Sequence, residues 1–121
     1  ADLYHNGKLQ MILAHKNMLY AIDRLGRYVK GYPVTLPKEV AYGPGLYPIN
    51  GGKDYLVAFI NEDNTLTVMD IKGNALPGWK DIELEEFIGA LPQIEKRGGE
   101  YVVLLETYKG KYEFTLKGEK R

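Results

Sequence analysis

One eight-residue pattern occurs three times in this chain of 121 residues, and each copy ends in glycine. The copies read LYAIDRLG at 19–26, LTVMDIKG at 66–73 and KYEFTLKG at 111–118. Their closing glycines, Gly26, Gly73 and Gly118, stand 47 and 45 positions apart. A period of this length constrains the fold strongly, because each unit must be one supersecondary element that buries its apolar surface against its neighbours.

An apolar, strand-like run precedes each copy, at residues 9–15, 55–61 and 101–107. The runs YLVAFI and YVVLL are almost continuously apolar, which is typical of strands covered on both faces. The repeated octets alternate more clearly, which indicates strands with one face in water. Helical signals are scarce, since the best stretch (84–91) contains a glycine and runs into Pro92. The sequence therefore predicts an all-β chain.

The predicted organisation is a single domain, 1–121, of three tandem units with four short antiparallel strands each. The units cover about residues 1–40, 41–86 and 87–121, and the third lacks its last outer strand. Glycine pairs or Asn-Gly at 6–7, 51–52 and 98–99 mark hairpin turns, because glycine tolerates the positive φ that tight turns require. Tyr32 and Trp79 follow equivalent glycines and are expected to fill the contacts between neighbouring units.

Residues 19–33, LYAIDRLGRYVKGYP, resemble the blades of the FG-GAP and quinoprotein-like β-propellers. Residues 66–79 repeat the pattern with Trp79 at the position of Tyr32, and the resemblance extends over essentially the whole chain. It implies propeller-type blades and a periplasmic or secreted bacterial setting. Relatives that bind calcium use D-x-D-x-D-G, whereas residues 2–7 read DLYHNG and place Tyr4 at a ligand position. We therefore expect neither calcium nor a cofactor.

Three blades are too few to close a propeller ring, which normally needs at least four. Four explanations stay open at this point. The chain is part of a longer propeller, or two copies form a six-bladed ring as a homodimer. Alternatively, the fold is a β-trefoil, which also has three repeats, or it is an open β-meander.

Composition argues against several functions. Sixteen Lys and Arg balance sixteen Asp and Glu, and a net charge of zero does not suit a nucleic-acid partner. No apolar stretch approaches the roughly 20 residues that span a bilayer, so we expect no membrane insertion. Serine and cysteine are both absent, which removes the commonest nucleophiles. His5 and His15 show no catalytic spacing, and the acidic run at 81–86 is interpreted as the solvated face of an edge strand.

The predicted function is a non-catalytic binding or assembly module. Tyr4, Tyr42 and Tyr47 lie near predicted rim turns, where exposed rings stack on sugars or grip peptides. We expect these rim loops to contact a protein or carbohydrate partner, since loops on a rigid scaffold carry function. The alternative is part of a quinoprotein- or hydrolase-type propeller enzyme whose site lies mainly in blades outside this chain.

Overall fold

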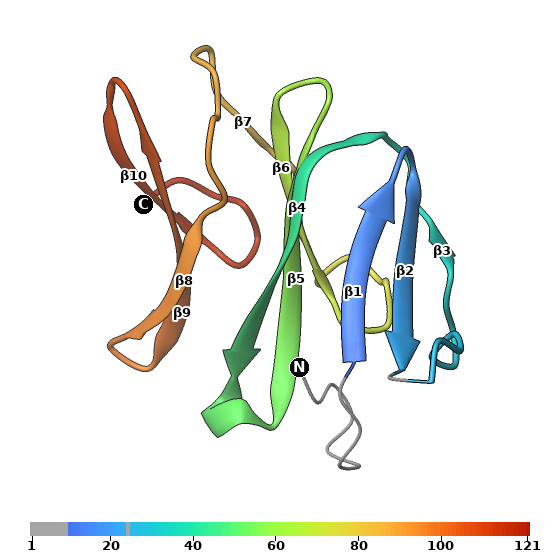
Figure 1. Cartoon of the computed structure of the whole chain (residues 1–121). Coiled ribbons are helices and arrows are strands. Elements are labelled where there is room, and N and C mark those ends of the chain that lie inside the picture. Colours follow the sequence, from blue (N-terminus) through green and yellow to red (C-terminus); the bar gives the residue numbers. More distant parts are fainter. Residues whose placement is uncertain (1–9, 24) are drawn as a thin grey trace.

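The computed structural model of the protein describes residues 10–23 and 25–121 (Figure 1). These residues form ten strands and one short 3-10 turn, η1 (Asn50–Gly52). The strands make three separate antiparallel sheets, which lie side by side in chain order (Figure 1). The prediction of an all-β chain is confirmed.

Each sheet is built from consecutive strands. Sheet 1 contains β1 (Gln10–His15), β2 (Met18–Asp23) and β3 (Val34–Thr35). Sheet 2 contains β4 (Val40–Ile49), β5 (Asp54–Asn61), β6 (Thr65–Asp70) and β7 (Ile82–Glu83). Sheet 3 contains β8 (Gln93–Arg97), β9 (Glu100–Thr107) and β10 (Gly110–Thr115). In all three sheets each strand pairs with the next one along the chain, so every connection is local.

The central hairpins of the three sheets have the same register. Ile12 lies opposite Ala21 in sheet 1, Ala58 opposite Val68 in sheet 2, and Leu104 opposite Glu113 in sheet 3. The repeat seen in the sequence is therefore a repeat of backbone pairing, and residues of different sheets can be compared position by position.

The turn after each second hairpin strand also recurs. One side-chain oxygen accepts hydrogen bonds from the backbone N–H groups two and four residues later, at 2.9–3.3 Å. The accepting residues are Asp23, Asp70 and Thr115. The glycine three residues after each acceptor has a φ of 80°, 88° or 80°, in the left-handed region that favours glycine. The repeated glycines are thus turn residues.

Alternation along the strands gives every sheet two faces. We call the face turned toward the next sheet in the chain the forward face, and the opposite one the rear face. The forward face of sheet 1 packs on the rear face of sheet 2 around a core that includes Leu19, Ala21, Val57, Phe59 and Met69. The forward face of sheet 2 packs on the rear face of sheet 3 around Leu66, Val68, Val103, Leu105 and Phe114.

Several predicted boundaries are wrong. The fourth, outer strand expected in each of the first two units covers only two residues, β3 in the segment 28–37 and β7 in the segment 75–84. Pro33 and Pro37 have no N–H for a ladder, which limits the pairing in the first of these segments. Gly51 and Gly52 belong to η1, whereas Gly98 and Gly99 form the expected two-residue hairpin turn between β8 and β9. Asn6 and Gly7 lie outside the described residues.

The β-trefoil alternative does not fit this topology. A trefoil joins strands from all three repeats into one barrel, whereas the described strands pair only within their own sheet. The three sheets instead contact one another through side chains. One core lies between sheets 1 and 2, and the other lies between sheets 2 and 3.

Candidate functional site

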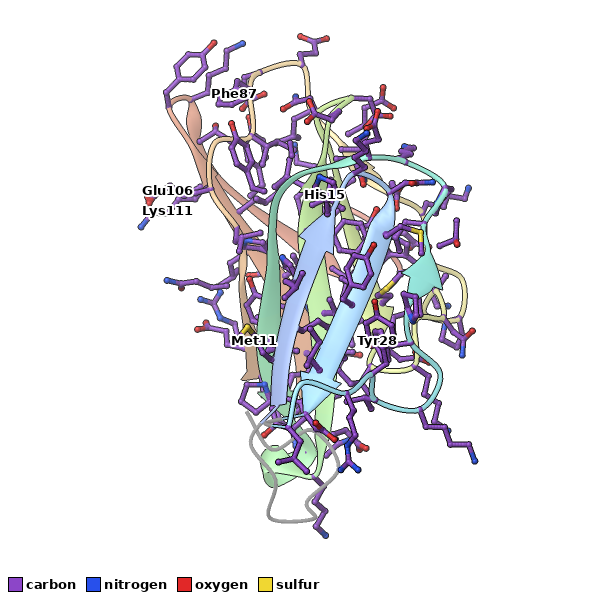
Figure 2. The ribbon with its side chains drawn as sticks, turned by 45° about the vertical axis from the view of Figure 1, so that its right-hand side comes forward. Met11, His15, Tyr28, Phe87, Glu106 and Lys111 are labelled. Carbon is purple, nitrogen blue, oxygen red and sulfur yellow. The ribbon has the colours of Figure 1, made fainter. Side chains whose placement is uncertain are left out.

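The rear face of sheet 1 is an exposed apolar surface on β1, β2 and the segment that follows them (Figure 2). It carries Met11, Leu13, Tyr20, Ile22 and Tyr28. Met11 is 62% exposed and Tyr28 is 58% exposed. The residues equivalent to Met11 in sheets 2 and 3, Val57 and Val103, are both 0% exposed. The rear face is therefore exposed in sheet 1, whereas the equivalent rear faces of sheets 2 and 3 are buried.

The repeated glycines show the same asymmetry between the sheets. A β-carbon at Gly73 would lie 2.7 Å from a methyl group of Val34 in sheet 1. A β-carbon at Gly118 would lie 2.1 Å from the carbonyl oxygen of Lys80, in the loop before β7. At Gly26 a β-carbon would meet nothing within 4 Å. Gly73 and Gly118 thus pack against the preceding part of the chain, whereas no described residue comes within 4 Å of the β-carbon position at Gly26.

The predicted contact tyrosines lie in different environments. Tyr42 on β4 is 39% exposed, and its ring meets the edge of Phe87 with 6.1 Å between centroids. Phe87 is 60% exposed, although nothing in its local sequence pattern distinguishes it from a core residue. Tyr47 is half-buried against the core of sheets 2 and 3, and its hydroxyl donates to the Pro92 carbonyl at 2.7 Å. Tyr4 lies outside the described residues.

Burial also changes the acidity of Tyr47 relative to an exposed tyrosine. It raises the pKa of the Tyr47 hydroxyl, because the apolar surroundings disfavour the phenolate. The hydrogen bond to Pro92 connects Tyr47 to the segment before β8, whereas Tyr42 and Phe87 form an aromatic pair that solvent reaches.

The two aromatic residues at equivalent repeat positions both lie between sheets. Tyr32 is buried in the core of sheets 1 and 2, and its hydroxyl donates to the backbone carbonyl of Ile71 in the turn of sheet 2. Trp79 is half-buried against the core of sheets 2 and 3, and its indole N–H donates to Asp81 at 2.8 Å. The next residue, Lys80, donates its backbone N–H to the Lys117 carbonyl in the turn of sheet 3. These segments link each sheet to the turn of the following one.

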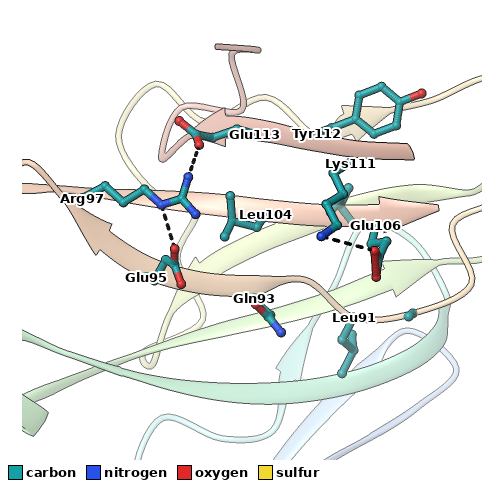
Figure 3. A pocket seen from close by; sticks show the side chains of 11 residues that line it. Leu91, Gln93, Glu95, Arg97, Leu104, Glu106, Lys111, Tyr112 and Glu113 are labelled. Carbon is teal, nitrogen blue, oxygen red and sulfur yellow. Dashed lines mark hydrogen bonds and ion pairs between the residues drawn. The ribbon is translucent and has the colours of Figure 1, made fainter. Parts of the chain in front are cut away.

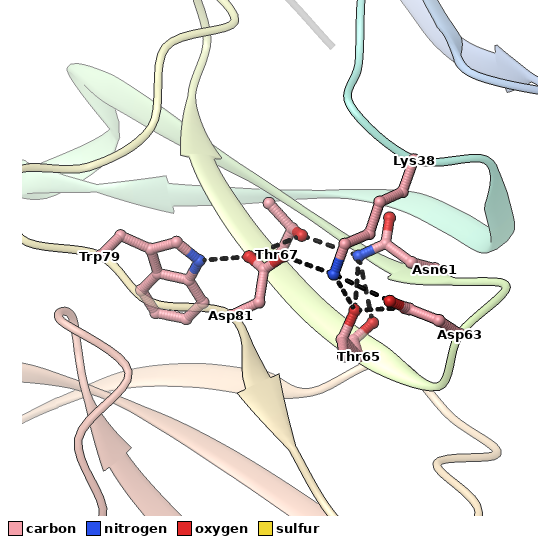
Figure 4. Close-up of polar contacts among 7 residues, drawn as sticks. All are labelled: Lys38, Asn61, Asp63, Thr65, Thr67, Trp79 and Asp81. Atoms are coloured by element: carbon pink, nitrogen blue, oxygen red, sulfur yellow. Dashed lines mark hydrogen bonds and ion pairs between the residues drawn. The ribbon is translucent and has the colours of Figure 1, made fainter.

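A polar cluster joins Lys38, in the segment between β3 and β4, to side chains of sheet 2 and its loops (Figure 4). The ammonium group of Lys38 lies 2.9 Å from Asp63 and 3.3 Å from Asp81. The hydrogen bond and charge of Asp63, followed by those of Asp81, raise the pKa of Lys38 despite partial burial. Hydrogen bonds to Thr65 and Lys38 lower the pKa of Asp63. Thr67 donates to the carboxylate of Asp81 at 2.9 Å.

This cluster is satisfied internally. Asn61, which is buried, donates to Thr67 at 2.8 Å and to Thr65 at 3.0 Å. Among the described side chains, no buried nitrogen or oxygen lacks a hydrogen-bond partner. A closed network of this kind fixes the segment between β3 and β4 against sheet 2, because each group left unpaired by a shift would cost its desolvation.

The interpretation of residues 81–86 as a solvated acidic face is wrong at two positions. Asp81 accepts hydrogen bonds within the polar cluster, as described above. Glu86 is 7% exposed and accepts hydrogen bonds from Thr107 at 2.8 Å and from the hydroxyl of Tyr112 at 2.5 Å. These two carboxylates are structural acceptors between segments far apart in the chain, while Glu83 and Glu85 are exposed.

Groups suited to metal chemistry are dispersed. His15 is exposed at the end of β1. Residues 10–23 and 25–121 hold no group of three or more His, Cys, Asp and Glu side chains placed to bind a metal ion. In the same part of the chain no helix is long and apolar enough to cross a membrane. The calcium-like motif at residues 2–7, which includes Asp2 and Asn6, lies outside the described residues. The same holds for His5, which was considered above as a catalytic residue.

Comparisons with known proteins support the fold. No protein-family model matches the chain, and no curated protein sequence does. A solved structure described as a protein of unknown function from Bacteroides caccae is similar, with a TM-score of 0.51 and 21% sequence identity. The similarity covers 93% of this chain but only 40% of that one, so the chain spans less than half of the length of the protein it resembles. At this identity the similarity concerns the fold alone.

Proposed function

We propose that the three sheets are propeller-type blades and that the chain is a non-catalytic assembly module. In this proposal a further β-sheet of the same kind packs on the rear face of sheet 1. The observation that carries it is the apolar rear face of sheet 1, on which Met11 and Tyr28 are exposed and Leu13, Tyr20 and Ile22 are half-buried.

The contacts between the three sheets support this choice of partner. Val57, Phe59 and Met69 on the rear face of sheet 2 are covered by the forward face of sheet 1. Met11, Leu13 and Ile22 occupy the same three positions on sheet 1. A forward face with residues like Leu19 and Ala21 therefore fits them. Full burial of a side chain such as Met or Leu contributes about 1.5–3 kcal/mol, which gives such a contact its driving force.

The length of the similar solved structure supports the same proposal. The similarity covers 40% of that protein. More than half of that protein's length is therefore left for further structural elements. A set of three sheets within a larger stack accounts for one sheet with an uncovered rear face. A preceding sheet would also fit the space beside Gly26. The equivalent glycines, Gly73 and Gly118, pack closely against the part of the chain that precedes them.

An added sheet tests the proposal. A second copy of residues 41–86, the unit that holds sheet 2, is joined ahead of Ala1. We expect Tm to rise by several degrees and the fluorescence of the apolar dye anilinonaphthalene sulfonate to fall, because the rear face becomes covered. Met11→Glu in the extended chain should remove both effects. Phe87→Glu is the matched control, since Phe87 is similarly exposed but lies on another surface. An unchanged Tm and dye signal in the extended chain would contradict the proposal.

A second candidate function rests on the exposed ring pair of Tyr42 and Phe87. Aromatic rings available to solvent stack on sugars and grip peptide side chains, so this pair supports a rim contact with a carbohydrate or protein partner. The probes are a glycan array and a peptide library. Binding that is lost in Phe87→Ala and kept in Tyr28→Ala would support this role. Equal binding by both variants would place the contact elsewhere.

A further inference from the structure

The forward face of sheet 3 differs in chemistry from the forward faces of sheets 1 and 2. Position by position, Leu19 of sheet 1 and Leu66 of sheet 2 correspond to Lys111. Ala21 and Val68 correspond in the same way to Glu113. The four apolar residues of sheets 1 and 2 are all 0% exposed, whereas the side chain of Lys111 is 84% exposed.

The strand paired with β10 shows the same exchange. Ile60 on β5 is 1% exposed and faces the core of sheets 2 and 3. Its counterpart on β9 is Glu106, whose side chain is 70% exposed. Three positions that are apolar in sheet 2 are therefore charged in sheet 3.

The charges on this face pair with one another (Figure 3). Arg97 on β8 lies 2.7 Å from Glu95 and 2.8 Å from Glu113, and so joins β8 to β10 across β9. Lys111 lies 3.9 Å from Glu106. These side chains surround a shallow hollow of about 640 Å³ that also exposes part of Leu104 (Figure 3).

The face is also complete without a further sheet. Val102 alternates with Val103 and so points to the forward side, yet it is 0% exposed. Its neighbours across the ladders are Glu95 and Thr115. Val102 is therefore covered within the chain, in a setting where the stems of long charged side chains shield apolar surface.

Burying this face would be unfavourable. Each ion taken from water into a protein interior costs several kcal/mol unless its partners compensate fully. In water the same ion pairs are tolerated at little cost or gain. An apolar sheet placed here would bury Glu106, Lys111 and Glu113 without offering them any polar partner.

We infer that the forward face of sheet 3 is a polar cap, so that the chain assembles with further sheets through sheet 1 only. End repeats with a polar outer face have this role in stacked repeat proteins. The cap also prevents the chain from joining its own copies head to tail. A six-sheet ring of two copies needs two junctions of sheet 3 on sheet 1, and each would press Lys111 and Glu113 against the apolar rear face.

Removal of the cap tests the inference. The variant Glu106→Ile, Lys111→Leu, Glu113→Val introduces the residues of sheet 2 at the same positions. By light scattering after size exclusion, we expect its mass to rise with concentration from 13.7 kDa through multiples of that value. Adding Met11→Glu on the rear face should reverse the rise. The control Glu39→Val, Glu62→Ile, Lys72→Leu changes the same residue types at exposed positions elsewhere and should leave the mass unchanged.

A cap variant that stays folded and keeps the mass of the unaltered chain would overturn the inference. A second measurement does not depend on that variant. Residues 41–86 are joined after Arg121 of the unaltered chain, and its Tm is compared with that of the chain extended ahead of Ala1. An equal gain at both ends would overturn the polar cap, and no gain after Arg121 would support it. No gain ahead of Ala1 would instead contradict the proposed function and leave the cap intact.

Discussion

The hydroxyl of Tyr112 on β10 donates a 2.5 Å hydrogen bond to the carboxylate of Glu86, in the segment between sheets 2 and 3. The hydrogen bond from Tyr112 is the main cause that lowers the pKa of Glu86. The hydrogen bond from Thr107 lowers it further, although burial opposes the effect. The same bond to Glu86, with burial, raises the pKa of Tyr112. A single contact between two sheets therefore depends on a charged Glu86 and a neutral Tyr112.

This pair predicts a pH dependence of stability at both ends of the scale. Because the pKa of Glu86 is lowered by folding, its contribution is present above the ordinary glutamate pKa of about 4.3 and is lost as pH falls further. Because the pKa of Tyr112 is raised, its contribution is present below about 10 and is lost as pH rises through the folded value. Tm is measured across this range for the unaltered chain, Glu86→Gln and Tyr112→Phe.

We expect Glu86→Gln to lower Tm near neutral pH and to flatten the acid limb, since the amide carries no charge to lose. Tyr112→Phe should flatten the alkaline limb. Glu85→Gln is the matched control, because Glu85 is exposed. If Glu85→Gln and Glu86→Gln change the acid limb equally, the contact with Tyr112 is not the cause.

The three equivalent glycines predict a graded series. Alanine at Gly26, Gly73 or Gly118 should cost about 1–2 kcal/mol for the left-handed backbone. At Gly73 and Gly118 the added β-carbon must also displace Val34 or the Lys80 carbonyl, which adds about 1–3 kcal/mol. Free energies of unfolding from urea titrations should rank the losses as Gly26 smallest and Gly118 largest, because a backbone atom yields less easily than a methyl group. Equal losses at Gly26 and Gly118 would mean that a neighbour also crowds Gly26.

The hydroxyl of Tyr32 provides a test of the link between sheets 1 and 2. Tyr32→Phe should cost about 1 kcal/mol, because the Ile71 carbonyl loses its donor while the ring stays in the core. Tyr28→Phe is the matched control and should cost less than about 0.5 kcal/mol at its exposed position. Chemical denaturation compares the two variants, and a loss in Tyr28→Phe as large as that in Tyr32→Phe would contradict the link.

Local patterns were sufficient to predict the repeat and its turns. The glycines that close the octets are turn residues with positive φ, and the alternating residues share faces as expected. The outer strands could not be predicted, because residues 28–37 and 75–84 have strand-like alternation but each form only a two-residue strand and one isolated bridge. Propensity alone does not decide how far a short edge segment pairs.

The roles of the carboxylates depend on contacts that no local window contains. Asp81 meets Lys38, 43 positions earlier, and Glu86 meets Tyr112, 26 positions later. A reading of alternation near residues 81–86 therefore predicted solvent exposure for both. Alternation likewise shows which residues share a face, but whether that face meets a neighbour, as for Phe59, or solvent, as for Met11, depends on the order of the sheets.

Equivalent leucines on two rear faces test the open end of the stack. Leu13 in sheet 1 and Leu105 in sheet 3 occupy the same repeat position, but Leu105 is 1% exposed and Leu13 is only half-buried. Leu105→Ala should cost about 2–5 kcal/mol, because it leaves a cavity in the core of sheets 2 and 3. Leu13→Ala should cost less than half as much, since solvent already reaches the site. In the chain extended ahead of Ala1 the cost of Leu13→Ala should rise toward that of Leu105→Ala, as the added sheet buries it. Urea titrations of five proteins measure this change: the chain, its Leu13→Ala and Leu105→Ala variants, the extended chain, and the extended chain with Leu13→Ala. A cost at Leu13 that the extension leaves unaltered would show that the rear face of sheet 1 takes no sheet.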